Sequence, residues 1–278
     1  MGLGKWVIHP IFQFATEEGK REDSLSNMPK TKSASARVCI ITGASTGIGK
    51  ATMELLRQKG QQVYNFDIKP DKGSKDYFLQ CDVTNPESLR QAVAEVLKRK
   101  GRIDSIFANA GVHLFANLEE TTATQLDQII SINLKGVFYF LQSIIPIMKK
   151  QMQGVILLMG SDQTLIGKSR SSAYGMSKGA IGQLAKSSAI DYAPFNIRVN
   201  CLCAGTVDTP LLQNAINRYH QLSGIPKEKI KKGLDSAQPI HRVAQPDEIA
   251  KVAHFLLSDE SSYVTGALIA ADGGYTSG

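Results

Sequence analysis

The feature that most constrains the fold is a repeated alternation of short apolar, β-branched runs with longer stretches of helical periodicity. The first run, 38–41, leads directly into a glycine-containing turn, and a helical stretch over about 50–59 follows and ends at Gly60. Continuously apolar strands that alternate with helices are typical of parallel sheets, because each connecting helix covers one face of the sheet. The sequence therefore predicts an α/β fold in which about seven strands form one doubly wound parallel sheet with helices on both faces.

The same alternation continues along the chain. The further predicted strands are 63–67, 77–81, 103–108, 154–159, 197–203 and 267–270, and the further predicted helices are about 86–100, 123–151, 173–193 and 246–258. Residues 211–240 break the alternation, at a place where an insertion could cover a site. We therefore expect residues 37–278 to form one domain.

An N-terminal extension, 1–36, precedes this domain. Its second part is polar and low in large apolar groups, as in a flexible lead-in. Met28 is an alternative start, in which case the first 27 residues result from a mis-assigned beginning of the chain. The other interpretation is an arm that packs on a partner subunit.

Composition and charge favour an ordinary globular protein and argue against several classes of function. Hydrophobic residues make up 42% and charged residues 21% of the 278 residues. The formal net charge of +7 is scattered, and the densest basic cluster, 227–232, has no interleaved aromatic residue, so no nucleic-acid partner is expected. Since no apolar run approaches about 18 residues, no membrane span is predicted. The four cysteines lack zinc-site spacing, which predicts no metal and suits reduced thiols in a cytoplasmic protein.

A glycine turn joins the first predicted strand to the first predicted helix. Gly43, Gly47 and Gly49 have the spacing G-x-x-x-G-x-G. Glycines let the backbone turn sharply and approach a ligand closely, and the free N–H groups at a helix N-terminus bind phosphate. In this context the pattern favours a site for the pyrophosphate of a dinucleotide. The alternative is a tight turn that binds no ligand.

Asp67 ends the second predicted strand, 24 residues after Gly43. A carboxylate at this place can accept hydrogen bonds from ribose hydroxyls, whereas a 2′-phosphate would meet a negative charge. Asp67 therefore favours NAD over NADP. The alternative is a surface aspartate that merely ends a strand.

Tyr174 and Lys178 lie four residues apart in the predicted helix 173–193, which places both side chains on one face. Ser161 lies 13 residues before Tyr174, just after the predicted strand 154–159. A free tyrosine has a pKa of about 10, and a neighbouring ammonium favours its phenolate form. The trio predicts that Tyr174 is an acid/base, that Lys178 lowers its pKa, and that Ser161 donates a hydrogen bond to the substrate oxygen. Taken singly, each residue also has a purely structural interpretation.

These residues and several further motifs resemble the short-chain dehydrogenase/reductase family. The matching elements are Thr42-Gly43-x-x-x-Gly47-Ile48-Gly49, Asp82-Val83, Asn109-Ala110-Gly111, Asn133, Ser161, Tyr174-x-x-x-Lys178, Thr206-x-x-Thr209 and Asp272-Gly273-Gly274. They follow the family's order and spacing over about 37–278. The resemblance implies a Rossmann-like fold and a dinucleotide-binding catalytic domain.

The resemblance also implies two sets of site residues. The catalytic set is Ser161, Tyr174, Lys178 and Asn133, in which Asn133 would hold a water of a proton relay. The cofactor-binding set is Gly43, Ser45, Thr46, Gly47, Ile48, Gly49, Asp67, Asp82, Val83, Asn109, Ala110, Gly111, Tyr174, Lys178, Val207 and Thr209. In this second set the pair 82–83 would border the adenine, and Val207 and Thr209 would hold the nicotinamide amide.

The predicted function is that of an NAD-dependent oxidoreductase that interconverts a secondary alcohol and a ketone by hydride transfer. The candidate substrates are a hydroxy acid, a 3-oxoacyl compound, and a sugar or polyol. The alternative is a catalytically silent protein of the same fold that senses NAD(H), since such a protein needs only the cofactor half of the site. The family commonly pairs the helices 123–151 and 173–193 between subunits, which implies a homotetramer or homodimer.

The sequence departs from the family's pattern at two positions. Ala204 stands where the family usually has a proline before Gly205, which loosens a turn at a cost of about 1 kcal/mol. Asp162 follows Ser161, where a serine or small residue is common, and a carboxylate there could matter to substrate choice.

Three further charged or titratable residues are placed near the predicted site by the sequence. Lys168 and Arg170 could bind an anionic substrate, although a basic, solvent-exposed loop is the simpler interpretation. His113, just after the Asn-Ala-Gly turn, could also face the substrate, although surface exposure is the simpler interpretation.

Overall fold

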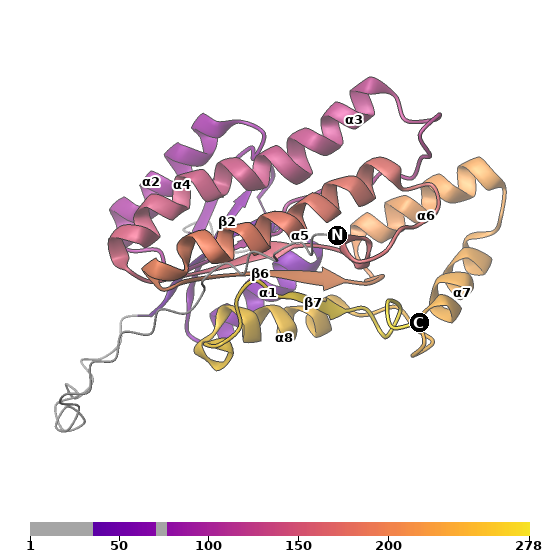
Figure 1. The fold of residues 1–278 in the computed structure, drawn as a ribbon. Coiled ribbons are helices and arrows are strands. Elements are labelled where there is room, and N and C mark those ends of the chain that lie inside the picture. Colours follow the sequence, from indigo (N-terminus) through magenta and orange to yellow (C-terminus); the bar gives the residue numbers. More distant parts are fainter. Residues whose placement is uncertain (1–35, 71–76) are drawn as a thin grey trace, which may run out of the picture. The chain divides into compact units, whose positions relative to one another are not determined.

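The computed structural model describes residues 36–70 and 77–278, and in this part of the chain seven strands form one parallel sheet (Figure 1). The strands are β1 (Val38–Thr42), β2 (Gln62–Asp67), β3 (Phe78–Gln80), β4 (Ser105–Ala108), β5 (Gly154–Met159), β6 (Ile197–Ala204) and β7 (Leu268–Ala271). Their order is β3-β2-β1-β4-β5-β6-β7, and every neighbouring pair is parallel. The predicted fold class is confirmed.

The helices connect these strands across both faces of the sheet. They are α1 (Gly47–Gln58), α2 (Pro86–Lys100), α3 (Ala123–Ile129), α4 (Gly136–Gln151), α5 (Ser172–Tyr192), α6 (Pro210–Ser223), α7 (Lys227–Ala237) and α8 (Pro246–Leu257). The single helix predicted over 123–151 is instead divided by a π-helical segment, η2 (Ile130–Lys135). Residues 211–240, which broke the alternation, contain two helices in succession, α6 and α7.

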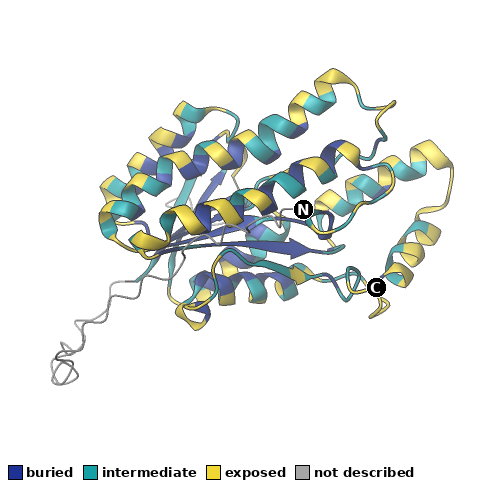
Figure 2. Cartoon of the chain, in the orientation of Figure 1, coloured by how far each residue is buried: buried dark blue, intermediate teal, exposed yellow. Residues whose placement is uncertain are grey.

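The two faces of the sheet carry separate apolar layers because side chains alternate along each strand. In β1, Ile40 points into the layer that α2, α4 and α5 cover, and Ile41 points into the layer that α1 and α8 cover. Figure 2 shows the resulting pattern, in which the central strands are buried and the helices that cover the sheet are exposed on their outer sides. The four cysteines are free and buried.

The segment Ala123–Gln151 is long and apolar enough to cross a membrane by length and composition. Its apolar side chains form part of the protein core, since Phe140, Leu141, Ile144 and Met148 are buried against the sheet. An aromatic pair fixes this packing: the rings of Phe140 in α4 and Phe66 in β2 lie 6.1 Å apart. We therefore interpret the segment as a core helix.

The order of the strands reverses direction between β1 and β4. From β1 the chain proceeds to β2 and β3 on one side, and from β4 it proceeds to β5, β6 and β7 on the other. The connections that follow β1 and β4 therefore diverge, and they leave a crevice at the carboxyl edge of the sheet, where open α/β sheets bind their ligands. This geometry positions the candidate site.

The core contact of Phe140 can be tested directly. We expect Phe140→Ala to lower the free energy of unfolding by about 3–5 kcal/mol, because a fully buried ring is lost and a cavity remains between α4 and the sheet. Urea unfolding followed by circular dichroism measures this change. Phe255→Ala in α8, where the ring is partly exposed, is the matched control and should cost clearly less. Equal losses in the two variants would contradict this description of the core.

Candidate active site

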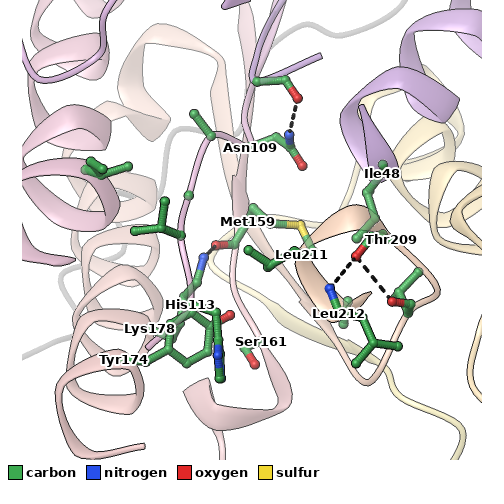
Figure 3. Close-up of a pocket in the computed structure, with 18 of the residues that line it drawn as sticks. Ile48, Asn109, His113, Met159, Ser161, Tyr174, Lys178, Thr209, Leu211 and Leu212 are labelled. Carbon is green, nitrogen blue, oxygen red and sulfur yellow. Dashed lines mark hydrogen bonds between the residues drawn. The ribbon is translucent and has the colours of Figure 1, made fainter. Parts of the chain in front are cut away.

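A cavity of about 780 Å³ lies at the carboxyl edge of the sheet, where the strand order reverses. Its walls come from the segments that follow β1, β2, β4, β5 and β6, from one face of α5, and from the start of α6. Figure 3 shows part of this cavity, with Tyr174 and Lys178 on one side and Ile48 and Thr209 on the other. Of the predicted site residues, all line the cavity except Ser45, Gly49 and Asn133.

The glycine turn after β1 forms one end of the cavity. Gly43 has φ +68°, and a Cβ atom there would lie 2.9 Å from the Cα of Ala110, so only glycine fits. Gly49 does not line the cavity; it permits close packing, because a Cβ atom there would lie 2.5 Å from Asn109 Nδ2. In the described structure the Thr46 side chain does not cap α1. The first N–H groups of α1 therefore face the cavity without a side-chain acceptor and suit a phosphate.

Asp67 lies at the end of β2, on the wall beside the glycine turn. Its carboxylate accepts hydrogen bonds from the backbone N–H groups of Ser45, at 3.1 Å, and Lys69, at 3.3 Å. Ser45 thus contributes by holding Asp67, and its own hydroxyl donates to the Lys69 carbonyl at 2.6 Å. Asp82 and Val83 line the same end of the cavity. A carboxylate fixed in this way suits ribose hydroxyls, as the sequence predicts.

Tyr174 and Lys178 lie one turn apart on α5 and face the cavity together (Figure 3). Lys178 Nζ donates a hydrogen bond to the carbonyl oxygen of Met159, at the end of β5, at 2.7 Å. The same nitrogen lies 5.7 Å from the centroid of the Tyr174 ring. Ser161, in the turn that follows β5, lies beside the tyrosine. The three side chains that the sequence singled out therefore converge on one point.

The protein's own environment disfavours charge on both members of the Tyr174–Lys178 pair. Burial raises the pKa of Tyr174 to about 12, and the nearby carboxylate of Asp162 acts in the same direction. Burial also lowers the pKa of Lys178 to about 8. In the protein alone, desolvation shifts the pKa of Tyr174 upward, opposite to the shift expected from Lys178. That Lys178 assists ionisation of Tyr174 stays a prediction. Tyr174 is a neutral phenol at pH 7, which is the form that donates a proton.

Asn133 lies in the π-helical segment and is almost completely buried outside the cavity. Its side-chain amide pairs with the backbone of Val112, accepting from the N–H and donating to the carbonyl, each at 2.9 Å. It also donates to Ser177 Oγ in α5 at 3.2 Å. Asn133 therefore ties the segment after β4 to the helix that carries Tyr174, whereas a water-holding role remains a prediction.

Several cavity residues differ from the sequence-based expectation or were not found by it. His113 was expected on the surface, but its ring packs edge-on against Tyr174, with 4.6 Å between centroids. Phe115 also lines the cavity and contacts the ring of Tyr219 in α6 at 5.1 Å. Leu211 and Leu212 line the opposite wall. His113 and Phe115 lie in a loop, where the sequence carries no periodic signal, so only the folded chain reveals their positions. Leu211 and Leu212 begin the stretch 211–240, which the sequence placed where an insertion could cover a site.

Lys168 and Arg170 are each engaged with a carboxylate of the protein. Lys168 Nζ lies 2.6 Å from Asp162 Oδ2 and lines the cavity. Arg170 forms an ion pair with Glu120 and stacks over the ring of Phe115. The simpler interpretation, a basic solvent-exposed loop, is therefore wrong for Lys168, whose side chain is largely buried.

The glycine turn, the fixed acidic residue and the Tyr–Lys pair are the features expected of an α/β oxidoreductase with a nicotinamide dinucleotide at the edge of its sheet. The chain belongs to the short-chain dehydrogenase/reductase family, whose members bind NAD or NADP. A family model described as enoyl-(acyl carrier protein) reductase matches residues 43–276.

Two curated relatives illustrate the sequence similarity. A cyclopentanol dehydrogenase from Comamonas is 34% identical over 251 residues, which cover 86% of this chain and 97% of the relative. A 3-oxoacyl-acyl-carrier-protein reductase, FabG, from Thermotoga maritima is 36% identical over 250 residues, which cover 86% of this chain and 97% of the relative. Both names describe chemistry at a hydroxyl or oxo carbon, and the family's members act on alcohols and ketones.

Solved structures show the same fold. Aldohexose dehydrogenase from Thermoplasma acidophilum superposes with a TM-score of 0.82 at 33% identity, covering 87% of this chain and 95% of that one. Levodione reductase superposes with a TM-score of 0.82 at 31% identity, covering 87% and 98%. ElxO, solved with NADP bound, has a TM-score of 0.78 at 26% identity, covering 87% and 100%.

The buried ammonium of Lys178 predicts a pH dependence of stability. Its pKa is about 8 in the folded protein against an ordinary value of 10.5, so between these values the unfolded chain binds more protons and the free energy of unfolding rises with pH. Lys178→Met lacks this rise. Any gain in stability from Lys178→Met is therefore greatest below pH 8 and shrinks by on the order of 3 kcal/mol toward pH 10.5.

Urea unfolding of wild type and Lys178→Met across this pH range measures the difference. Lys186→Met, which removes an exposed lysine from the same helix, is the control. A difference between Lys178→Met and wild type that stays constant with pH would show that Lys178 titrates normally.

Proposed function

We propose that this protein is an NAD-dependent oxidoreductase that interconverts a secondary alcohol and a ketone, with Tyr174 as the acid/base. The observation that carries the proposal is the position of the Tyr174–Lys178 pair. Both side chains are buried and face the same cavity as the glycine turn and the uncapped start of α1. One cavity thus joins a proton-donating group to a site suited to a dinucleotide.

The residues of the cavity fit a nicotinamide dinucleotide along its whole length. Asp67 would accept hydrogen bonds from the adenosine ribose, and the N-terminus of α1 would bind the pyrophosphate. Val207 and Thr209 would hold the nicotinamide amide, and Lys178 would contact the adjoining ribose. When bound, the dinucleotide supplies or accepts the hydride and, in its oxidised form, brings a positive charge.

Proton transfer in this proposal is performed by Tyr174. In ketone reduction the neutral phenol of Tyr174 donates its proton to the carbonyl oxygen as the carbon receives hydride. In alcohol oxidation the phenolate of Tyr174 accepts the hydroxyl proton. Because burial raises the pKa of Tyr174, oxidation depends on nearby positive charge, which Lys178 and the oxidised nicotinamide would provide.

The walls favour an uncharged substrate among the candidates. Lys168 and Arg170, which could bind a carboxylate or phosphate, are each paired with a carboxylate of the protein. Leu211, Leu212 and Phe115 supply apolar surface. Among the similar proteins, cyclopentanol dehydrogenase and aldohexose dehydrogenase have uncharged substrates, whereas FabG takes a 3-oxoacyl carrier protein. We therefore propose a neutral secondary alcohol, cyclic or polyhydroxylated, in preference to a hydroxy acid or a 3-oxoacyl thioester.

The proposal extends to oligomeric state and location. We propose that the protein is a homotetramer or homodimer in the cytoplasm. Exposed apolar side chains on α4 and α5, such as Phe138 and Ile190, support pairing through these helices.

Tyr174→Phe tests the acid/base assignment. We expect the variant to bind NADH as wild type does and to lose turnover by about 100-fold or more, because only the hydroxyl that transfers the proton is removed. NADH absorbance with cyclopentanol, cyclohexanol, glucose and 3-hydroxybutyrate measures turnover, and NADH fluorescence measures binding. Tyr192→Phe, the same change at the other end of α5, is the control. If wild type binds NADH but oxidises none of a broad panel, the sensing protein becomes the better interpretation.

Asp67→Asn tests the cofactor preference. The amide keeps the size of the side chain but loses the charge, so its hydrogen bonds to ribose hydroxyls weaken and the repulsion of a 2′-phosphate disappears. We expect kcat/KM for NAD to fall by roughly 10-fold and the ratio of NAD to NADP efficiency to fall with it. Parallel assays with the two cofactors measure this ratio. An unchanged ratio would remove Asp67 from cofactor selection, and Asp127→Asn, at an exposed position in α3, controls for loss of charge.

A further inference from the structure

A buried carboxylate lies directly beside the reacting groups. Asp162, which follows Ser161 in the turn after β5, is 2% exposed and lines the cavity. One of its oxygens accepts a hydrogen bond from Ser161 Oγ at 2.8 Å. The other oxygen lies 2.6 Å from Lys168 Nζ. Asp162 therefore links the serine of the site to a cation in the cavity wall.

In these contacts the single proton of the Ser161 hydroxyl is donated to Asp162. The hydroxyl donates to Asp162 and accepts from the backbone N–H of Gln163 at 3.2 Å. A hydroxyl has one proton to donate and two lone pairs. While the proton points to Asp162, Ser161 offers Tyr174 only a lone pair, which can accept from the neutral phenol but cannot donate to a phenolate.

The surroundings of Tyr174 and Asp162 contain charges of both signs. The ring of His113 packs on Tyr174 from the segment after β4, and burial lowers the pKa of this imidazole, so it is neutral at pH 7. Lys178 lies beside Tyr174 on α5. Lys168, on the loop before α5, pairs with Asp162 and lies 4.1 Å from the centroid of Tyr275. The carboxylate of Asp162 acts on Tyr174, and its charge opposes formation of a phenolate.

We propose that Asp162 is a positioning residue that turns the Ser161 proton away from Tyr174 and thereby holds Tyr174 in its proton-donating form. The inference rests on the proposed acid/base role of Tyr174, and it adds a residue that sets the pH range over which Tyr174 acts. Lys168 positions Asp162 in turn, through the ion pair and through its place over Tyr275. Two effects of Asp162 act in the same direction: its negative charge, and its capture of the proton that would otherwise stabilise a phenolate.

The two effects can be separated by a pair of substitutions. Asp162→Asn removes the charge but keeps an oxygen that can accept the Ser161 proton. Asp162→Ala removes both the charge and the acceptor, so that Ser161 can donate to the phenolate. Since alcohol oxidation requires the phenolate, its rate rises with pH as Tyr174 ionises, and each substitution should move this rise to lower pH.

The experiment is the pH profile of kcat/KM for oxidation of the secondary alcohol in the panel that wild type uses best. The acid limb of this profile is the part in which kcat/KM rises with pH. We expect it to move to lower pH by roughly 0.5–1 unit in Asp162→Asn and further in Asp162→Ala. The binding constant for NADH, measured by fluorescence, should change less than about 2-fold, because Asp162 lies on the substrate side. Glu120→Gln, which loses the same charge from an exposed ion pair nearby, should leave the limb in place.

A limb that stays in place or moves to higher pH in both Asp162 variants, while wild type is active, overturns the inference and leaves the proposed function intact. Absence of turnover in wild type itself overturns the proposed function and the inference with it. If Asp162→Asn does not fold because Lys168 loses its partner, Asp162→Asn/Lys168→Gln removes both charges and carries a smaller shift in the same direction, because loss of the Lys168 cation opposes part of the effect. A variant that lowers kcat without moving the limb would show that Asp162 is only structural.

Discussion

The close approach of the glycine turn after β1 to the segment after β4 is the contact on which the site depends. Asn109 holds the two together: its side-chain amide donates to the carbonyl oxygens of Thr42 and Gly43, at 3.1 and 3.0 Å. The Thr42 hydroxyl in turn accepts from the backbone N–H groups of Asn109 and Ala110, at 3.0 and 3.1 Å. No side chain larger than hydrogen fits between them at Gly43. The turn therefore fixes both the start of α1 and the floor of the cavity.

Burial governs the chemistry at the other end of the same cavity. Tyr174 and Lys178 are buried in the protein, and the loss of solvation raises the pKa of the tyrosine and lowers that of the lysine, so both groups favour their neutral forms. A site of this kind responds strongly to any charge brought into it, because a low-dielectric surrounding screens little. The ion pair of Asp162 and Lys168 therefore affects the protonation of Tyr174 more strongly than an ion pair on the surface would.

Periodicity and motif spacing predicted the fold and the convergence of Ser161, Tyr174 and Lys178, because these depend on local patterns. A strand is recognisable by its apolar run, and two residues four apart on a helix share a face wherever that helix packs. The direction of the Tyr174 shift was not predicted, because desolvation depends on everything that covers the ring, including His113 from a distant segment. The division of the helix over 123–151 also left no signal, since a π-helical turn has no characteristic residue pattern.

The wall opposite Tyr174 depends on Thr209, which also lies against the glycine turn that we propose binds the cofactor. Thr209 caps α6, accepting from the backbone N–H of Leu212 at 3.3 Å, and its side chain lies against the position where Gly47 would carry a Cβ atom, also at 3.3 Å. The first turn of α6 then supplies Leu211 and Leu212 to the cavity. A group that binds at the glycine turn and contacts Thr209 therefore touches the residue that orients the substrate wall. Because Thr209 also caps α6, a dinucleotide bound at the glycine turn would affect the position of Leu211 and Leu212 in the opposite wall.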